Sequence, residues 1–234
     1  MEKVNQCFWE HNGNDTLLWS ITFPGAFTRG QNLDEALAKM PKEIEAYCRW
    51  ANIPFIPMES IVKEEKPSSL EIRDAYTDCI FQGEMKPLTR KTYVYLRDLA
   101  LKSAKDFLEL YQAIPDKKLG SLPKRKAFYG EVPVTAEEMY EHTKSVNSYY
   151  FGQIGIDADH EGTIYECRLK GFTLLEKKQG FLKNEVFLGS YGELWSLAKV
   201  LRRFIWHNRI HAKAMYRMAK KAFPSDYLVN PFHC

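Results

Sequence analysis

The chain has 234 residues, of which 45% are hydrophobic and 27% are charged. This composition is ordinary for a folded globular protein, and the length suits one large or two small domains. The net charge of +3 comes from 33 basic and 30 acidic residues that are spread along the chain, so it gives no electrostatic case for a nucleic-acid partner.

Two further features bear on where the chain works. No apolar run approaches the roughly 18 residues that a membrane span needs, and the first residues lack the apolar core of a signal peptide. The five cysteines are scattered and form no C-x-x-C pair, which argues against a disulfide framework or a thiolate zinc site. We therefore expect a cytoplasmic protein with no membrane partner.

The first quarter of the chain has the composition of strands separated by turns. Residues 4–11 (VNQCFWEH) and 17–23 (LLWSITF) are rich in aromatic and β-branched side chains, with the turn sequence NGND between them. Residues 58–67 (MESIVKEEKP) are expected to form a further strand. The segment KPSSLE, at 66–71, is the best candidate for a linker.

A helical pattern separates the second and last of these segments. Asn32 is a good N-cap with Glu35 three residues later. Apolar residues then recur at helical spacing, namely Leu33, Ala36, Leu37, Met40, Ile44 and Tyr47. Pro41 falls inside the pattern and is expected to kink or split the helix, because proline cannot donate the helical hydrogen bond.

From Pro87 onward the chain contains four long segments with helical periodicity. They span residues 87–114, 132–156, 162–181 and 192–223. The second opens with Thr135 and Glu138 at capping-box spacing, and the third contains Gly171, which should weaken it. Four helices of this length predict an antiparallel four-helix bundle, an architecture that builds metal sites from side chains on facing helices.

The last helical segment directs two histidines toward the core. His207 and His211 are four residues apart and share a helix face with apolar residues, namely Leu197, Val200, Phe204, Met215 and Met218. On its own, an H-x-x-x-H spacing fits two hydrogen-bonded core histidines as well as a pair of metal ligands. In the second segment, His142 shares a face with Met139 and Val146 and also points inward.

Three inward imidazoles on two helices favour the metal site. Imidazole nitrogens four residues apart can reach one ion, and three neutral imidazoles with one open position form the arrangement of a catalytic zinc site. We therefore predict that His142, His207 and His211 bind a divalent transition metal, zinc or nickel. The other histidines are interpreted as bystanders: His11, His160 and His233.

Other polar residues near these histidines have simpler interpretations. Cys167 is expected to be a buried structural cysteine, and Glu166 could act as a general base only if it turned inward. Arg202 and Arg203 either neutralise an anionic substrate or belong to a solvated charged face, to which Arg209 is also assigned. The solvated face is the simpler of the two accounts.

Two segments carry a resemblance to a known family. In EHTKSVNSYYFGQIG a histidine lies seven residues before an aromatic pair, and WHNRIHAKAMYRMA contains the H-x-x-x-H spacing. With these motifs, residues from about 87 to 223 resemble the DinB-like (DinB/YfiT) superfamily of metal-binding four-helix bundles. The resemblance implies a three-histidine site at His142, His207 and His211, and activities such as thiol-dependent transfer. The tryptophan that often precedes the family's second helix is absent from GEVPVTAEEM.

The N-terminal part carries a second resemblance. LLWSITFPGAFTRGQNLDEALAKMPKEIEAY contains a strand, a Pro-Gly turn, a short strand and a helix start. In this it is similar to HicB-like domains, which are small folds of β-β-β-α-β order. The turn is shorter than usual and Pro41 departs from the pattern. The resemblance implies either a regulatory domain or an accessory one.

Together these observations predict an α+β chain in three parts. Residues 1–68 are expected to form the HicB-like domain, 69–86 a linker or ambiguous segment, and 87–234 the DinB-like bundle. The first functional hypothesis is a metal-dependent hydrolase or thiol-dependent transferase with a small-molecule substrate, a thiol among the candidates. The second is a non-enzymatic regulatory or partner-binding protein. Both a monomer and a homodimer are kept as assembly states.

Overall fold

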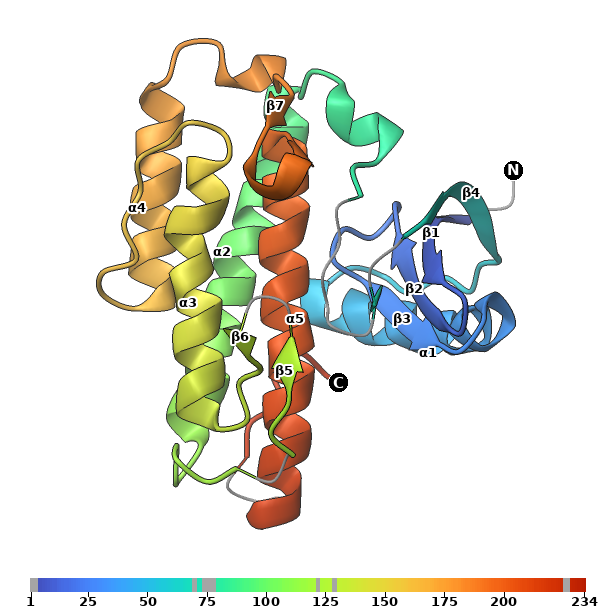
Figure 1. The fold of residues 1–234 in the computed structure, drawn as a ribbon, viewed down its shortest axis with the longest axis vertical. Coiled ribbons are helices and arrows are strands. Elements are labelled where there is room, and N and C mark those ends of the chain that lie inside the picture. Colours follow the sequence, from blue (N-terminus) through green and yellow to red (C-terminus); the bar gives the residue numbers. More distant parts are fainter. Residues whose placement is uncertain (1–3, 69–70, 73–78, 121–122, 128–129, 225–227) are drawn as a thin grey trace.

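The computed structural model describes residues 4–68, 71–72, 79–120, 123–127, 130–224 and 228–234. Within these ranges a four-stranded sheet and helix α1 come first, and helices α2 to α5 follow (Figure 1). The described chain is thus of mixed α and β structure, with the sheet at its N-terminal end, as the sequence predicts.

The N-terminal sheet has the strand order β3-β2-β1-β4. Its strands are β1 (Asn5–Asn12), β2 (Asp15–Ser20), β3 (Phe27–Gly30) and β4 (Ser60–Pro67). The β1–β2 and β2–β3 pairs are antiparallel, whereas β4 pairs with β1 in parallel. This is possible because α1 follows β3 and carries the chain back before β4 begins. The element order β-β-β-α-β is the expected one.

Helix α1 (Leu33–Ala51) begins where its cap predicts. The Asn32 side chain accepts a hydrogen bond from the backbone N–H of Glu35, and the Glu35 carboxylate accepts one from the N–H of Gln31. Pro41 lies inside the helix without splitting it, so of the two expected outcomes, a kink or a split, the split is wrong.

The four remaining helices lie side by side (Figure 1). They are α2 (Arg90–Ala113), α3 (Ala136–Gly152), α4 (Ile164–Lys177) and α5 (Leu197–Ala222). Gly171 does not interrupt α4; a Cβ there would lie 2.2 Å from the Phe151 ring, so its absence lets α3 and α4 approach closely. No helix among the described residues has both the length and the apolarity of a membrane crossing.

Helix α5 lies between the sheet and the other long helices (Figure 1). One face of the sheet packs on α1, with Leu18 in the larger core. The other face packs on Trp206 of α5, whose ring centroid lies 5.0 Å from that of Trp19 and 6.1 Å from that of Phe27. Trp206 therefore anchors α5 to the sheet, and the next residue, His207, points elsewhere.

The segment between the sheet and α2 is only partly described. Residues 69–70 and 73–78 of the expected linker lie outside the described residues, and the rest includes a short 3-10 helix, η2 (Gln82–Met85). Glu84 of η2 accepts hydrogen bonds from Arg202 of α5, one of them 3.0 Å long. The exact domain boundary stays a prediction.

Candidate metal centre

The three predicted histidines sit on two helices with well-defined starts. Thr135 and Glu138 form the expected capping box at the start of α3, which sets the face on which His142 lies. The Ser196 side chain accepts from the N–H of Lys199 at the start of α5, three turns before His207. His207 and His211 then share the face of α5 that meets α3.

The three imidazoles converge. One ring nitrogen from each of His142, His207 and His211 can be chosen so that all three lie within 4.8 Å of one another. The Nε2 atoms of His207 and His211 are 3.2 Å apart. The ring centroid of His142 is 5.1 Å from that of His207 and 5.0 Å from that of His211. The three side chains that the sequence singles out are therefore close together, and their role as metal ligands stays a prediction.

The surroundings keep these imidazoles neutral. His207 is buried, and His142 and His211 are half-buried. Burial lowers the pKa of all three, and for His207 and His211 to well below the usual value. Protonation of His207 is opposed further by His211 and His142 whenever they are protonated, and by Arg203 and Arg168, so its pKa falls further. Neutral imidazole is the form that binds a metal ion, so no proton has to leave first at neutral pH.

The geometry of the pair fits shared ligation. Two nitrogens bound at about 2.0–2.1 Å to a tetrahedral ion lie about 3.3 Å apart, close to the 3.2 Å between the two Nε2 atoms. A single N–H···N hydrogen bond would account for this pair alone, whereas one shared ion would account for the convergence of all three imidazoles. His207 Nδ1 is buried and has no hydrogen-bond partner among the described residues. The donor set thus fits an ion such as zinc or nickel, but without a carboxylate orienting the His207 ring.

Two buried arginines lie behind His207, and neither has a carboxylate partner among the described residues. Arg203 donates from Nη2 to the Tyr150 hydroxyl over 3.1 Å, while its Nε and Nη1 have no partner there. Arg168 donates from Nε to Asn147, and its two terminal nitrogens likewise have none. Burial lowers the pKa of Arg168 to about 9, which leaves it charged at neutral pH. Positive charge therefore surrounds the deep side of the histidine cluster.

A cleft of about 870 Å³ opens beside the histidines. Of the three histidines, His211 forms part of its wall, next to Met139 of α3. Its other walls come from α1, β3, Pro123, Arg125 and residues 132–134. This volume lies within the range of small-molecule sites, which is about 300–1,000 Å³. The cleft gives a small molecule access to the half-buried edge of the cluster.

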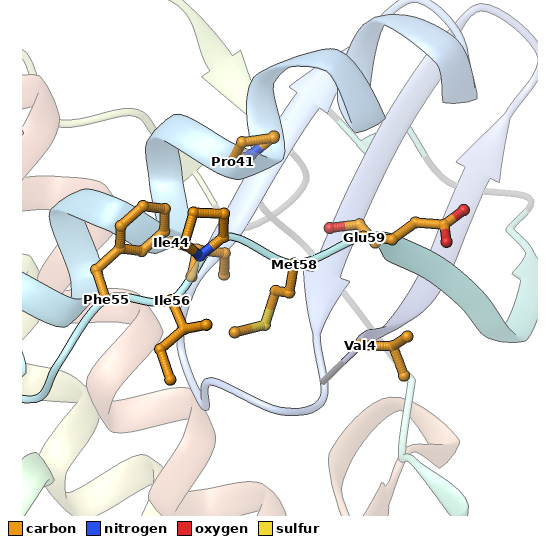
Figure 2. A pocket seen from close by; sticks show the side chains of 9 residues that line it. Val4, Pro41, Ile44, Phe55, Ile56, Met58 and Glu59 are labelled. Atoms are coloured by element: carbon orange, nitrogen blue, oxygen red, sulfur yellow. The ribbon is translucent and has the colours of Figure 1, made fainter. Parts of the chain in front are cut away.

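A second cleft, of about 670 Å³, lies between α1 and the chain leading into β4 (Figure 2). Its lining is mostly apolar and includes Ile44, Phe55, Ile56 and Met58, with Glu59 as its charged residue. None of the three histidines lines it. It is therefore a separate feature of the N-terminal part.

The other candidates from the sequence take structural roles. The Glu166 side chain caps the start of α4 through Thr163 and points away from the core, so it is no general base here. Cys167 is buried, as expected. Arg202, Arg203 and Arg209 are buried, so their assignment to a solvated face is wrong. Arg168 is not among the residues predicted from the sequence, because an arginine on a helix is ordinarily solvated.

Comparison of the chain with models of protein families, with curated proteins and with solved structures finds no match. The function therefore has to be inferred from the site itself.

Proposed function

We propose that this chain is a metal-dependent enzyme that holds a divalent transition metal, zinc or nickel, on His142, His207 and His211. The observation that carries the proposal is the convergence of three imidazole nitrogens from two helices to within 4.8 Å of one another. Three imidazoles leave one position of a tetrahedral ion open, which distinguishes a catalytic site from a structural one. The reaction class that fits is hydrolysis or thiol-dependent transfer on a small-molecule substrate.

The residues around the cluster suit this chemistry. A bound dication would lower the pKa of a water or thiol at the open position and so supply a nucleophile at neutral pH. His211 presents its edge to the cleft, where a substrate can approach. Arg203 and Arg168 place positive charge behind His207, which favours an anionic partner at the site over a neutral one. Tyr150, whose ring centroid is 6.1 Å from that of His207, closes the side near Arg203.

The resemblances support the same proposal. We propose that residues 87–234 form a DinB-like bundle and residues 1–68 a HicB-like domain. Four long helices lying side by side support the first assignment, and the β-β-β-α-β order with a parallel β1–β4 pair supports the second. On this proposal the bundle carries the chemistry, and the N-terminal domain is accessory or regulatory.

Elemental analysis of the purified full chain tests the metal site. We expect about one transition-metal ion per chain in the wild type and a severe loss in His211→Ala. His160→Ala is the matched control, because His160 is a surface histidine bonded to Ser148, away from the cluster. If the wild type takes up no stoichiometric metal even when zinc or nickel is supplied, the non-enzymatic alternative, a regulatory or partner-binding protein, replaces this proposal.

A further inference from the structure

The cleft beside His211 has one predominant sign of charge. Its lining includes six basic side chains and a single acidic one, Glu43; the basic ones are Arg29, Lys39, Lys42, Arg125, Lys213 and Arg217. Glu43 is already engaged, because Arg209 and Lys213 both donate to its carboxylate. The cleft therefore presents a positive surface to whatever enters it.

Two of these cations have no carboxylate to neutralise them within the described part of the chain. Lys42 on α1 has no ion pair there. Arg217 on α5 donates from Nε to the backbone carbonyl of Lys213 and forms no ion pair. Both are exposed and line the cleft, Lys42 from α1 and Arg217 from α5. Surface cations placed in this way are available to a ligand.

Apolar side chains line the cleft between the charged ones and the histidine cluster. Val132, Val134 and Met139 contribute from one side, and Ile210 and Ala214 from α5. On the side of the cleft formed by α5, His211, Ala214 and Arg217 follow one another at successive turns of the helix. This side therefore presents an imidazole, then an apolar side chain, then a cation. A ligand that matches this wall has an apolar body and an anionic end.

We propose that the cleft binds an anionic small molecule with an apolar body, its anionic group held by Lys42 and Arg217 and its other end directed at His211. The basic side chains of the cleft favour an anionic ligand. The two buried arginines behind His207 favour an anionic ligand as well. The proposal of a binding site depends only on the residues that line the cleft, and not on a bound metal. Its role in presenting a substrate to the histidines rests on the function proposed above.

A matched pair of fluorescent ligands tests the cleft without any metal. 8-Anilinonaphthalene-1-sulfonate joins an aromatic body to a sulfonate, and N-phenyl-1-naphthylamine has the same body without the charge. Both are titrated into chelator-treated full-length chain at low ionic strength. We expect Lys42→Gln with Arg217→Gln to weaken binding of the sulfonate about tenfold and to change binding of the neutral ligand less than about twofold.

Two control variants locate the effect. Lys91→Gln with Lys105→Gln removes the same charge from exposed positions on α2 that do not line the cleft, and it should leave both ligands unaffected. Ala38→Trp places a bulky side chain at an exposed position of the cleft wall and should weaken both ligands. Equal loss of sulfonate binding in the two double variants, or no loss in either, would overturn the proposal.

A second measurement connects the cleft to the histidines. The Co²⁺-loaded chain is titrated with 3-mercaptopropionate and with 2-mercaptoethanol, and the near-ultraviolet band of a cobalt-bound thiolate is followed. We expect tighter binding of the carboxylate-bearing thiol, and loss of this preference in the Lys42→Gln, Arg217→Gln variant. Equal affinities would separate the cleft from the metal site. Failure to take up Co²⁺ would overturn the proposed function, while the fluorescence result would still decide whether the cleft binds anions.

Discussion

Helix α5 has two faces with buried charge, and they differ in how that charge is balanced. On the face toward η2 and α1, Arg202 pairs with Glu84 and Arg209 pairs with Glu43. On the face toward α3 and α4, Arg203 meets a tyrosine hydroxyl instead of a carboxylate. The first face carries its own counterions, and the second does not.

This difference distinguishes buried charges that hold the fold together from buried charges that are available to a ligand. A buried charge without a counterion is costly, so a protein that retains one gives up stability unless a ligand offsets the cost. The matched face of α5 joins it to the N-terminal part of the chain. The unmatched face carries His207 and His211, which meet His142 of α3. Buried positive charge without a carboxylate partner among the described residues thus lies close to His207, next to the histidines that we propose as metal ligands.

The largest effect is expected on the matched face. Glu43→Leu removes the carboxylate that accepts from Arg209 and Lys213 and leaves a buried guanidinium without a counterion. Breaking a buried ion pair from one side costs about 3–5 kcal/mol, and we expect the free energy of unfolding to fall by this amount. Urea denaturation measures it.

The control for this variant is a carboxylate on the solvent side of the same helix. Glu45 pairs loosely with Arg49 at 3.7 Å, and both side chains are largely exposed. Glu45→Leu should cost less than about 1 kcal/mol. Similar losses at the two positions would mean that the Glu43 network does not hold α1 to α5.

Metal binding should have the next largest effect, and on the other face. An ion present at about one hundred times its Kd stabilises the folded chain by about 2.7 kcal/mol. Wild-type protein should therefore melt at a higher temperature with zinc than with a chelator, and His211→Ala should lose that difference. Differential scanning calorimetry of both proteins in both conditions is the measurement. If His211→Ala lowers Tm equally with and without chelator, the histidines are only core residues.

The pH dependence of the unfolding free energy is a smaller effect, and it concerns the face of α5 that pairs with Glu43. Burial alone would raise the pKa of Glu43, but the charges of Arg209 and Lys213 together outweigh it and hold that pKa below its usual value. A carboxyl with a lower pKa in the folded state stabilises the fold above its unfolded pKa, about 4.3. That contribution is lost as the pH falls through the folded pKa.

Glu43→Gln should therefore flatten the acid side of the stability profile. Between about pH 5 and pH 3, the wild type should lose more unfolding free energy than this variant, because glutamine has no proton to gain. Urea denaturation at a series of pH values measures the slope, with Glu45→Gln as the surface control. A Glu43→Gln profile as steep as that of the wild type would show that other carboxyls dominate acid unfolding.

The sequence predicts the local parts of this molecule well. Caps such as Asn32 and the Thr135–Glu138 box depend on residues three positions apart, and they form where expected. The inward faces of His142, His207 and His211 follow from helical spacing in the same way. These features need no knowledge of distant parts of the chain.

Long-range partners are what the sequence could not supply. Arg209 lies on the polar side of a helical wheel, yet it is buried because Glu43, 166 residues earlier, covers it. The cleft draws its walls from α1, β3, residues 132–134 and α5, and no local pattern brings these segments together. The convergence of His142 on the other two histidines likewise depends on the packing of α3 against α5, which periodicity suggests but does not measure.

The smallest change in unfolding free energy is expected at Arg168, which has no carboxylate partner among the described residues. This change tests the comparison between the two faces of α5 directly. Arg168 is fully buried, its guanidinium carbon lies 3.4 Å from the centroid of the Phe204 ring, and only its Nε has a hydrogen-bond partner among the described residues. Arg168→Met keeps the apolar stem and removes a buried charge that no carboxylate offsets, so the metal-free protein should change in unfolding free energy by less than about 1 kcal/mol or become more stable. Arg209→Met, on the matched face, deprives Glu43 of a partner and should cost about 3 kcal/mol. Urea denaturation of both variants with chelator present measures the difference. Equal losses would mean that the two faces of α5 are balanced alike, and the unmatched charge would then no longer point to an anionic ligand.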